Sequence, residues 1–498
     1  MEFGNFILYG LQVAIQPLNL IYCFIGVFIG TLIGVLPGIG PTGTLSLLLP
    51  ITFHIPPVSA IIMLAGIYYG CQYGGSITSI LANIPGEASS VITTLDGYQM
   101  ARQGKAGLAL GVSTIGSFIA GTIAIIGLMF LAYPLAKAAL KFGPPEYFSL
   151  MCVGLVLLTF LTQGSMLKSL IMALLGLFIG LVGLDPFTAK PRFTFGFKEL
   201  MDGVGIIPLV MGLFGISEVL LNLESEGREI YKTETRGLFA SLKGWVKAKW
   251  AIVRGTIVGF LCGILPGGGA VLASFVSYAV EKRFSKHPEK FGTGVIEGVA
   301  APESANNAAA QSSFVPLLSL GIPPNVVMAV LYGGLLIHGI QPGPFLVKDH
   351  PDVFWGLVAS MYIGNIMLLI LNLPLIGMWV KILKVPYTIL FPLILLFCLI
   401  GVYSVNYAVF DIYLMVIFGC AGYVMKKLDF EPAPLVMAYV LSPILESSFR
   451  RSLSLSGGSL TIFFVRPISL AGMCAVIGLI VFQVLSARRS KKRKVDVQ

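Results

Sequence analysis

The chain has 498 residues, of which 56% are hydrophobic and only 11% are charged. A soluble domain carries about a quarter charged residues, so this composition excludes a protein with an ordinary water-facing surface and indicates one that lies in a bilayer. The net charge of +10 resides in loops and in the C-terminal tail. There, basic residues are more typical of the cytoplasmic side of a membrane protein than of a nucleic-acid surface.

Long apolar runs separate the charged residues. A helix needs roughly 20 mostly apolar residues to cross the hydrocarbon core, and continuous rather than alternating hydrophobicity favours helices over strands. We therefore predict an all-α polytopic membrane protein with roughly 11 to 13 membrane segments, some of them broken or re-entrant. The runs without Asp, Glu, Lys or Arg cover 3–86, 107–136, 147–167, 255–280, 304–347, 353–380, 385–410 and 467–487.

A Pro-Gly motif, GVLPGIG at residues 34–40, interrupts the first apolar run. Proline removes a backbone donor and breaks a helix, and glycine accepts the backbone angles of a chain reversal. Inside a bilayer, unwound backbone survives only where protein or a water-filled cavity shelters it. We therefore expect Pro37, Gly38 and Gly40 to interrupt a membrane helix.

The next segment, YGGSITSILANIPGEASS at residues 73–90, combines small and hydroxyl side chains with a second Pro-Gly break. Hydroxyls and amides are neutral ligands that can hold a carboxylate or a sodium ion without strong repulsion. An acid inside a membrane is a functional hypothesis by default. The substrate-binding residues that we predict here are Ser76, Asn83, Pro85, Gly86 and Glu87.

A polar segment of mixed charge at 223–250 separates a first membrane repeat, 1–222, from a second, 251–487. The basic flank of this linker and the basic tail, 488–498, are both expected in the cytoplasm. The N-terminal flank carries only Glu2 and no basic residue. This asymmetry favours two homologous halves of opposite orientation, which is an inverted repeat.

Both Pro-Gly motifs recur in the second half. GVLPGIG returns as GILPGGG at 263–269, and ANIPGE at 82–87 returns as LGIPPN at 320–325. One copy alone is better explained by a kinked packing helix, and glycine-rich faces also let helices approach closely. Two motifs in the same order in both halves favour a duplicated binding site. We expect the further helix breaks at Pro266, Gly267 and Gly269.

The polar stretch at 297–325 supplies the second set of candidates. We predict that the broken hairpins of both halves meet near the midplane, where helix N-termini receive a substrate carboxylate and freed carbonyls bind the coupling cation. A sodium ion near Asn83 and Asn306 is one option, and Glu87 and Glu303 can alternatively cap helix ends near water. The predicted substrate-binding residues here are Pro302, Glu303, Ser304, Asn306, Asn307, Ser312, Ser313 and Pro323.

Sequence motifs of nucleotide binding and metal-dependent catalysis do not occur in the sequence. We find no nucleotide fingerprint, P-loop or metalloprotease signature, and the glycines at 267–269 follow a proline inside an apolar run without a following Lys-Ser or Lys-Thr. The four histidines are scattered without ligand spacing. We therefore expect no enzymatic activity and no cofactor, and we expect transport to be coupled to a sodium or proton gradient.

Together with their surroundings, these residues resemble the large membrane subunit of the tripartite tricarboxylate transporters. The likeness extends from about residue 16 to about residue 470. The most specific matching stretches are GVLPGIGPTGTLSLLLP, YGGSITSILANIPGEASSVITTLDGYQMARQGKAGLALG, ILPGGGAVLASFVSYAVEKRF, FGTGVIEGVAAPESANNAAAQSSFVPLLSLGIPP and SLSLSGGSLTIFFVRPIS.

The resemblance implies a multi-pass permease of the bacterial inner membrane that takes up a tricarboxylate or dicarboxylate. It also implies two partner proteins, a small membrane subunit and a periplasmic solute-binding protein, and a sodium or proton gradient as the driving force. The lipid bilayer is the remaining partner, and no nucleic acid is expected. A membrane-embedded enzyme and a passive channel or accessory scaffold are the alternatives. Gradient-dependent uptake would separate a transporter from the channel or scaffold, and the enzyme would need an acid, Ser-Lys or His-Glu constellation that we do not find in the sequence.

Overall fold

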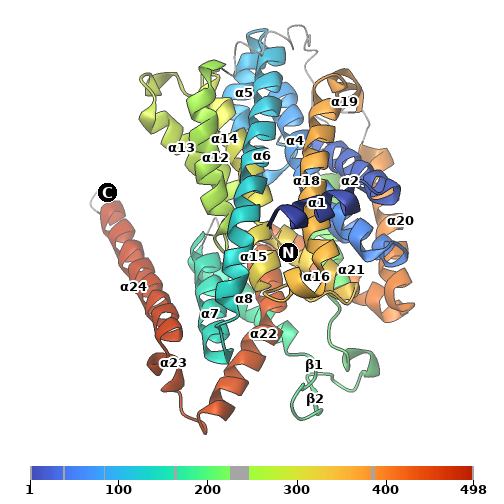
Figure 1. Ribbon diagram of the computed structural model, residues 1–498, viewed down its shortest axis with the longest axis vertical. Helices are drawn as coiled ribbons and strands as arrows, with labels where there is room; N and C mark the ends of the chain where they lie inside the picture. The colour runs from blue at the N-terminus through green and yellow to red at the C-terminus, as the bar shows by residue number, and fades with distance from the viewer. Residues whose placement is uncertain are drawn as a thin grey trace. The chain divides into compact units, whose positions relative to one another are not determined.

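The computed structural model describes residues 3–36, 40–83, 85–161, 165–224, 246–382 and 387–495, and these are largely helical (Figure 1). The chain divides into two compact units. Unit 1 comprises Met1–Ala136 and Gly205–Val424, and unit 2 comprises Lys137–Val204 and Met425–Gln498. Each unit therefore combines chain from before and after the polar linker. The sequence repeats at 1–222 and 251–487 are a different division and stay a prediction, and most of the linker, 225–245, lies outside the described residues.

The helices of unit 1 include short 3-10 turns and one π-helical segment, η4, which joins α9 to α10. In chain order its described elements are α1 Phe3–Ala14, α2 Pro17–Val35, α3 Gly40–Leu48, η1 Leu49–His54, α4 Pro57–Ala82, η2 Ala88–Ser90, α5 Thr93–Arg102, α6 Ala106–Ala139, α9 Ile206–Val210, η4 Met211–Ile216, α10 Ser217–Leu223, α12 Lys249–Ile264, α13 Gly269–Phe284, η6 Pro288–Lys290, α14 Glu297–Ser312, α15 Phe314–Leu320, α16 Val326–Ile337, α17 Leu346–Asp349, α18 Pro351–Asn372, α19 Ile376–Ile382, α20 Tyr387–Asn406 and α21 Val409–Lys427.

Within the described residues, four helices are long and apolar enough to cross a membrane, namely α2, α6, α18 and α21. Further apolar helices of 10–17 residues are Asn5–Ala14, Pro144–Leu157, Met166–Gly180, Ile206–Leu221, Val326–Ile337, Ile394–Asn406 and Pro467–Val481. This confirms an all-α membrane protein. The predicted total of roughly 11 to 13 segments and the opposite orientation of the halves stay predictions.

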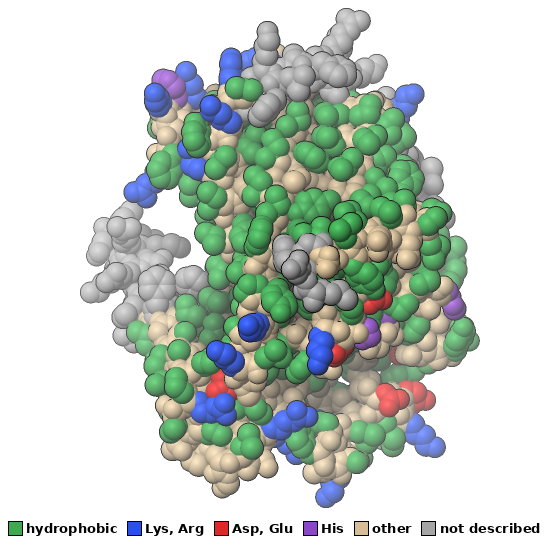
Figure 2. Space-filling model, in the orientation of Figure 1, with side chains coloured by type: hydrophobic (Ala, Val, Ile, Leu, Met, Phe, Trp, Pro, Cys, Tyr) green, Lys and Arg blue, Asp and Glu red, His purple; other side chains and the backbone are tan. Residues whose placement is uncertain are grey.

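Large hydrophobic side chains remain exposed on the long helices. On α2, Leu18, Ile21 and Phe24 are all more than 40% exposed, and on α6 Phe130 is 65% exposed. Hydrophobic side chains cover much of the surface seen in Figure 2. In water such a surface would be strongly unfavourable, so these helix faces are suited to contact with lipid.

The closest helix packing in unit 1 occurs twice. α2 packs along α4, and α12 packs along α14, beside which it lies in Figure 1. In both pairs the first helix carries glycines four residues apart, which let its backbone approach the second helix. A Cβ atom on these glycines would overlap the main-chain oxygens of Met63, Ile67 and Cys71 opposite Gly26, Gly30 and Gly34, and of Ala301, Ala305 and Ala309 opposite Gly255, Gly259 and Gly263. The sequence duplication thus has a counterpart in helix packing.

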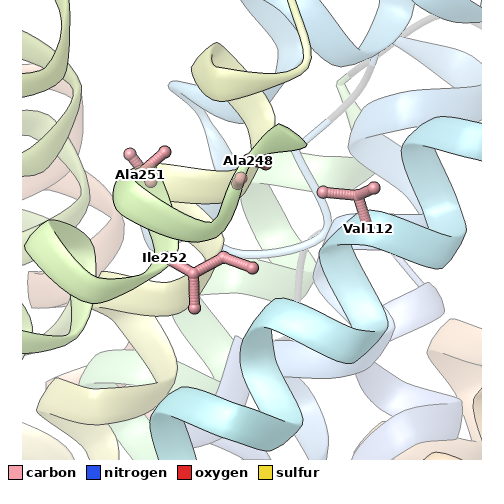
Figure 3. Close-up of a cluster of buried hydrophobic side chains, with 6 residues drawn as sticks. Val112, Ala248, Ala251 and Ile252 are labelled. Carbon is pink, nitrogen blue, oxygen red and sulfur yellow. The ribbon is translucent and has the colours of Figure 1, made fainter. Parts of the chain in front are cut away.

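Small side chains also let α6 pack against the second pair. A buried cluster joins Val112 of α6 to Ala251 and Ile252 of α12 and to Ala300 and Ala301 of α14. Figure 3 shows Val112 facing the start of α12, where Ala248 precedes the helix and Ile252 lies in its first turn. Since alanines fill most of this cluster, the backbones of the helices lie close together, and polar side chains of α6 reach α14.

Unit 2 is held together around α22. Both α7 and α8 pack against α22, and α24 packs against α7. Its strands pair antiparallel, with Gly183 opposite Arg192, and Arg192 and Arg450 hold Glu446 at 2.6 and 2.9 Å. The ion pairs therefore tie this hairpin to α22. The elements of unit 2 are α7 Pro144–Leu161, α8 Met166–Gly180, β1 Gly183–Leu184, β2 Pro191–Arg192, η3 Lys198–Leu200, α22 Ala433–Leu455, α23 Ile462–Val465 and α24 Pro467–Val495.

Candidate functional site

The two helix pairs end in the same kind of turn. Asn83 follows α4 with φ 55°, and Gly321 follows α15, the continuation of α14, with φ 70°. Both residues take the left-handed conformation that commonly terminates helices. In each copy a proline follows two residues later, Pro85 and Pro323, and it prevents the helix from resuming at once.

The residue that precedes the next helix has the same backbone conformation in both copies. Glu87 before η2 has φ −146° and ψ 167°, and Asn325 before α16 has φ −149° and ψ 172°. Each forms a local cap: the amide of Glu87 donates to Ser90 Oγ at 3.4 Å, and Asn325 Oδ1 accepts from the amide of Met328 at 3.0 Å. The same backbone therefore carries an acid in the first copy and an amide in the second.

The GVLPGIG and GILPGGG motifs lie where one helix ends and the next begins. Gly40 starts α3 with φ 64°, and Gly269 starts α13 with φ 73°. The amide of Gly267 donates to the carbonyl of Pro324 at 2.8 Å. In the second copy the two predicted breaks therefore touch. Of the remaining predicted break residues, Pro266 lies in the same turn as Gly267, and Pro37 and Gly38 lie outside the described residues.

Glu303, in the middle of α14, is completely buried. Its carboxyl group accepts hydrogen bonds from Ser76 of α4 and Thr93 of α5, from Ser113 of α6 at 3.3 Å and from Asn306 at 3.4 Å. We call these four donors the Glu303 cage. All four donors are neutral. Side chains of α4, α5, α6 and α14 therefore converge on one carboxyl group, and none of them is a cation.

Glu87 is buried beside α4 in a second polar cluster. Gln72 Nε2 donates to Glu87 Oε2 at 3.1 Å, Ser89 Oγ contacts Glu87 Oε1, and the same Ser89 Oγ lies 2.8 Å from Gln72 Oε1. We call these three side chains the Glu87 ring. A Cβ on Gly75 would lie 2.7 Å from Glu87 Cγ, so the missing side chain at this position makes room for the acid.

One face of α14 carries buried polar atoms without a hydrogen-bond partner. They are Ser304 Oγ, Asn307 Oδ1 and Gln311 Oε1, whose spacing puts them on the same side of the helix. The amide nitrogen of Asn307 is occupied, because it donates to Ser117 Oγ at 2.8 Å and to Asn306 Oδ1 at 2.7 Å. A buried polar atom left unpaired costs about 1–3 kcal/mol, so this face is suited to a polar ligand.

The other predicted residues surround these clusters or lie at their edges. Ser313 Oγ donates to Ala309 O at 2.7 Å and accepts from Asn325 Nδ2 at 3.0 Å, which links α14 to the second turn. Asn83 is exposed, and a sodium ion near Asn83 and Asn306 stays a prediction. Buried among the rest are Gly86, Pro302, Ser312 and Pro323, while Pro85 is half-buried.

Several residues of the site were not predicted from the sequence. Gln72 and Thr93 flank the predicted segment 73–90, Ser89 lies within it, and Ser113 and Ser117 lie on α6. Ser113 and Ser117 are one turn apart in a charge-free apolar run, so they share one face of the helix. That spacing was a usable signal, but it does not say that Ser113 reaches the carboxyl group of Glu303 and Ser117 its main-chain carbonyl.

The model of the tripartite tricarboxylate transporter TctA family matches residues 20–437. The chain belongs to this family. It is therefore the large membrane subunit of a tripartite tricarboxylate transporter, as its sequence motifs predicted. The family implies a small membrane subunit and a periplasmic binding protein as partners of a TctA chain.

Two relatives of this TctA chain come from Agrobacterium vitis. An uncharacterised 52.8 kDa protein in the region 3′ of ttuC′ in TAR-I is 50% identical over 490 residues, covering 98% of both chains. An uncharacterised protein in the region 3′ of ttuC′ in TAR-II is 51% identical over 240 residues, which are 48% of this chain and 99% of the relative. No solved structure matches the chain.

Proposed function

We propose that this TctA chain is the permease of an ion-gradient-driven uptake system for a dicarboxylate or tricarboxylate in the bacterial inner membrane. A periplasmic solute-binding protein delivers the substrate, and a sodium or proton gradient drives its movement. The inverted orientation of the two halves is part of the same proposal, because opposed repeats give a carrier two alternative openings.

The polar face of α14 is the observation that carries this proposal. Ser304, Asn307 and Gln311 leave three buried polar atoms unpaired on one side of a helix, directly beside the Glu303 cage. In a folded protein such atoms nearly always find partners. A hydroxyl and two amides can bind a carboxylate, its hydroxyl groups or a coupling ion while adding no fixed charge of their own.

The broken helices supply the remaining binding chemistry. A helix N-terminus contributes about 0.3–1 kcal/mol to binding an anion at an exposed end and up to about 2 kcal/mol when partly buried. The turn at Gly267 to Gly269 starts α13, and the turn ending at Asn325 starts α16, and the amide of Gly267 joins the two turns by its bond to the carbonyl of Pro324. Two helix starts in one place are suited to the negative charge of a carboxylate.

A transport assay with a matched pair of variants tests the proposal. The chain is reconstituted in liposomes with its small subunit and binding protein, using a labelled carboxylate found by a binding screen on the binding protein. We expect Asn307→Ala to lower uptake by about tenfold or more, which corresponds to about 1.4 kcal/mol. Asn372→Ala is the control, because Asn372 is also a buried helical asparagine with an unpaired Oδ1 but belongs to α18.

Two outcomes would contradict the proposal. One is normal uptake by Asn307→Ala with a folded, inserted protein. The other is strong uptake at micromolar substrate by this chain alone, since a permease that takes substrate from a binding protein needs that protein at low concentration. Uptake that proceeds only down the substrate's own gradient would favour the passive channel instead.

A further inference from the structure

If Glu87 is ionised, the Glu87 ring has too few hydrogen atoms to form all of its hydrogen bonds. The hydroxyl of Ser89 contacts Glu87 Oε1 and lies 2.8 Å from Gln72 Oε1, but a serine hydroxyl has one hydrogen to donate. With an ionised Glu87, two acceptors compete for it and one buried oxygen faces the lone pairs of Ser89. A proton on Glu87 Oε1 removes the conflict, because Glu87 then donates to Ser89, Ser89 to Gln72, and Gln72 Nε2 back to Glu87.

Rotating the amide of Gln72 by half a turn does not remove the need for this proton. Oxygen and nitrogen of an amide are assigned from the hydrogen-bond network, so both orientations must be considered. In the rotated amide, Gln72 Nε2 faces Ser89 and Gln72 Oε1 lies 3.1 Å from Glu87 Oε2. Two oxygens at this distance need a hydrogen between them, which only Glu87 can supply.

The Glu303 cage likewise has too few hydrogen atoms for all of its hydrogen bonds if Glu303 is ionised. Ser76 Oγ contacts Glu303 Oε2 and also lies 3.0 Å from the carbonyl of Gln72, and it has one hydrogen for both. A proton on Glu303 lets the carboxyl donate to Ser76 and Ser76 donate to Gln72. Since none of the four cage residues is a cation, an ionised Glu303 would have no charged partner to offset its desolvation.

Two other buried acids of the described chain, Glu281 and Glu146, are held differently. Arg254 binds both carboxylate oxygens of Glu281 at 2.7 Å, and Arg466 binds Glu146 at 2.6 Å. These acids have a guanidinium partner and are suited to remain ionised. Glu87 and Glu303 contact only hydroxyls and amides, so they differ from Glu281 and Glu146 in the charge of their partners.

The groups that face the two carboxyls add no positive charge. From α4, Tyr68 and Cys71 lie near Glu87 and Tyr73 near Glu303, and the two acids lie within electrostatic range of each other. The parts of α6 and α15 beside them carry no charged residue. Asp96 of α5 and Tyr278 of α13 are joined at 2.8 Å, and Arg254 of α12 is paired with Glu281 of α13.

We propose that Glu87 and Glu303 are a pair of proton-binding sites, linked through Gln72 and Ser76 on successive turns of α4, and that they make the permease a proton symporter. This proposal rests on the proposed transport function and names its coupling ion. Each carboxylate takes one proton from water on the side to which the site opens. The proton remains on the carboxyl oxygen while the cage is closed, and it returns to water when the site opens to the other side.

Infrared spectroscopy of the purified full-length chain tests the protonation without transport. Protonated and ionised carboxyl groups absorb in separate regions, so we expect Glu87→Gln and Glu303→Gln each to remove acid carbonyl absorption at neutral pH. Glutamine is neutral and of the same size, and it imitates the protonated acid, so both variants should fold. Glu281→Gln is the control and should remove carboxylate absorption instead. Acid absorption that neither substitution at 87 or 303 changes would overturn the proposal.

Uptake in liposomes with both partner proteins tests the coupling. We expect a pH gradient, acidic outside, to drive accumulation without sodium, and Glu303→Gln to lose accumulation against a gradient while retaining exchange of internal for external substrate. Wild-type uptake that follows a sodium gradient and ignores pH would overturn proton coupling and leave the proposed permease intact. If no carboxylate is taken up under any gradient, the permease function fails, and the infrared result alone decides whether the two acids are protonated.

Discussion

The helix pairs α2–α4 and α12–α14 have the same backbone and different chemistry. Both pairs close on three glycines spaced four residues apart, and both end in a left-handed residue, a proline and an extended cap. The position of Glu303 in the second pair is occupied by Ala65 in the first, where it is fully buried. Conversely, Glu87 of the first pair corresponds to Asn325 in the second.

This difference shows which features the duplication preserves. The close approach of the helices depends on glycine, and proline keeps each helix from resuming after its turn. These residues are present in both copies, whereas the left-handed residue is Asn83 in one copy and Gly321 in the other. Side chains that bind a proton or a ligand are present once, at different positions in the two copies. The two halves are thus equivalent in packing and complementary in chemistry, which a series of substitutions can test.

The largest effect is expected from filling the glycine contacts. A Cβ on Gly259 would lie 2.7 Å from Ala305 Cα, and one on Gly30 would lie 2.9 Å from Ile67 Cα. We expect Gly30→Val and Gly259→Val each to cost about 3 kcal/mol or more, the upper range for overpacking, and to lower the melting temperature in detergent. Gly478→Val is the control, since nothing lies within 4 Å of its Cβ. A loss in only one of the two pairs would show that their packing is not equivalent.

Two substitutions of Glu303, with smaller expected losses of stability, separate the role of its carboxyl group from the role of its volume. Glu303→Ala removes the acceptor of the Glu303 cage and leaves a cavity, so we expect it to lower the free energy of unfolding by about 2–4 kcal/mol. Glu303→Gln retains the volume and the neutral charge of a protonated acid, and we expect a loss within about 1 kcal/mol. Thermal unfolding of both variants measures the difference, and equal losses would mean that the cage holds an ionised carboxylate.

A still smaller loss of stability is expected from removing the helix cap formed by Asn325. Asn325→Ala removes the bond to the amide of Met328 at 3.0 Å, and we expect a loss of about 1 kcal/mol. Asn325→Asp retains an oxygen acceptor and should restore most of it. Hydrogen exchange at the start of α16 reports the change directly. If exchange there is as slow in Asn325→Ala as in the wild type, Asn325 does not stabilise this helix start.

The smallest effect concerns an acid with a charged partner, as a contrast to the neutral cages. In unit 2, the hydrogen bond from Arg450 holds the pKa of Asp185 well below its usual range, with help from the amides of Phe187 and Thr188. Since the folded pKa is lowered, this stabilisation is complete above the ordinary value of about 4 and is lost as the pH falls below it. We expect exchange in the β1–β2 hairpin to accelerate on acidification, and less so in Arg450→Gln. An equal acceleration in both would exclude this ion pair as the cause.

Much of this protein is determined by local sequence. The charge-free runs predicted a helical membrane protein, because a bilayer requires apolar spans whatever their neighbours are. The Pro-Gly motifs indicated where helices end, since proline and glycine act on their own backbone. Their repetition identified corresponding turns, and the quoted motifs identified the family, which the comparison confirmed.

The tertiary structure alone decided which polar side chains share a site. Ser76 and Thr93 reach Glu303 although they are 227 and 210 residues away in sequence, and Ser113 comes from a helix whose apolar run predicted only a membrane span. Which side chains come into contact depends on how α4, α5, α6 and α14 pack. That packing is set by the fit of many side chains at once rather than by any one segment.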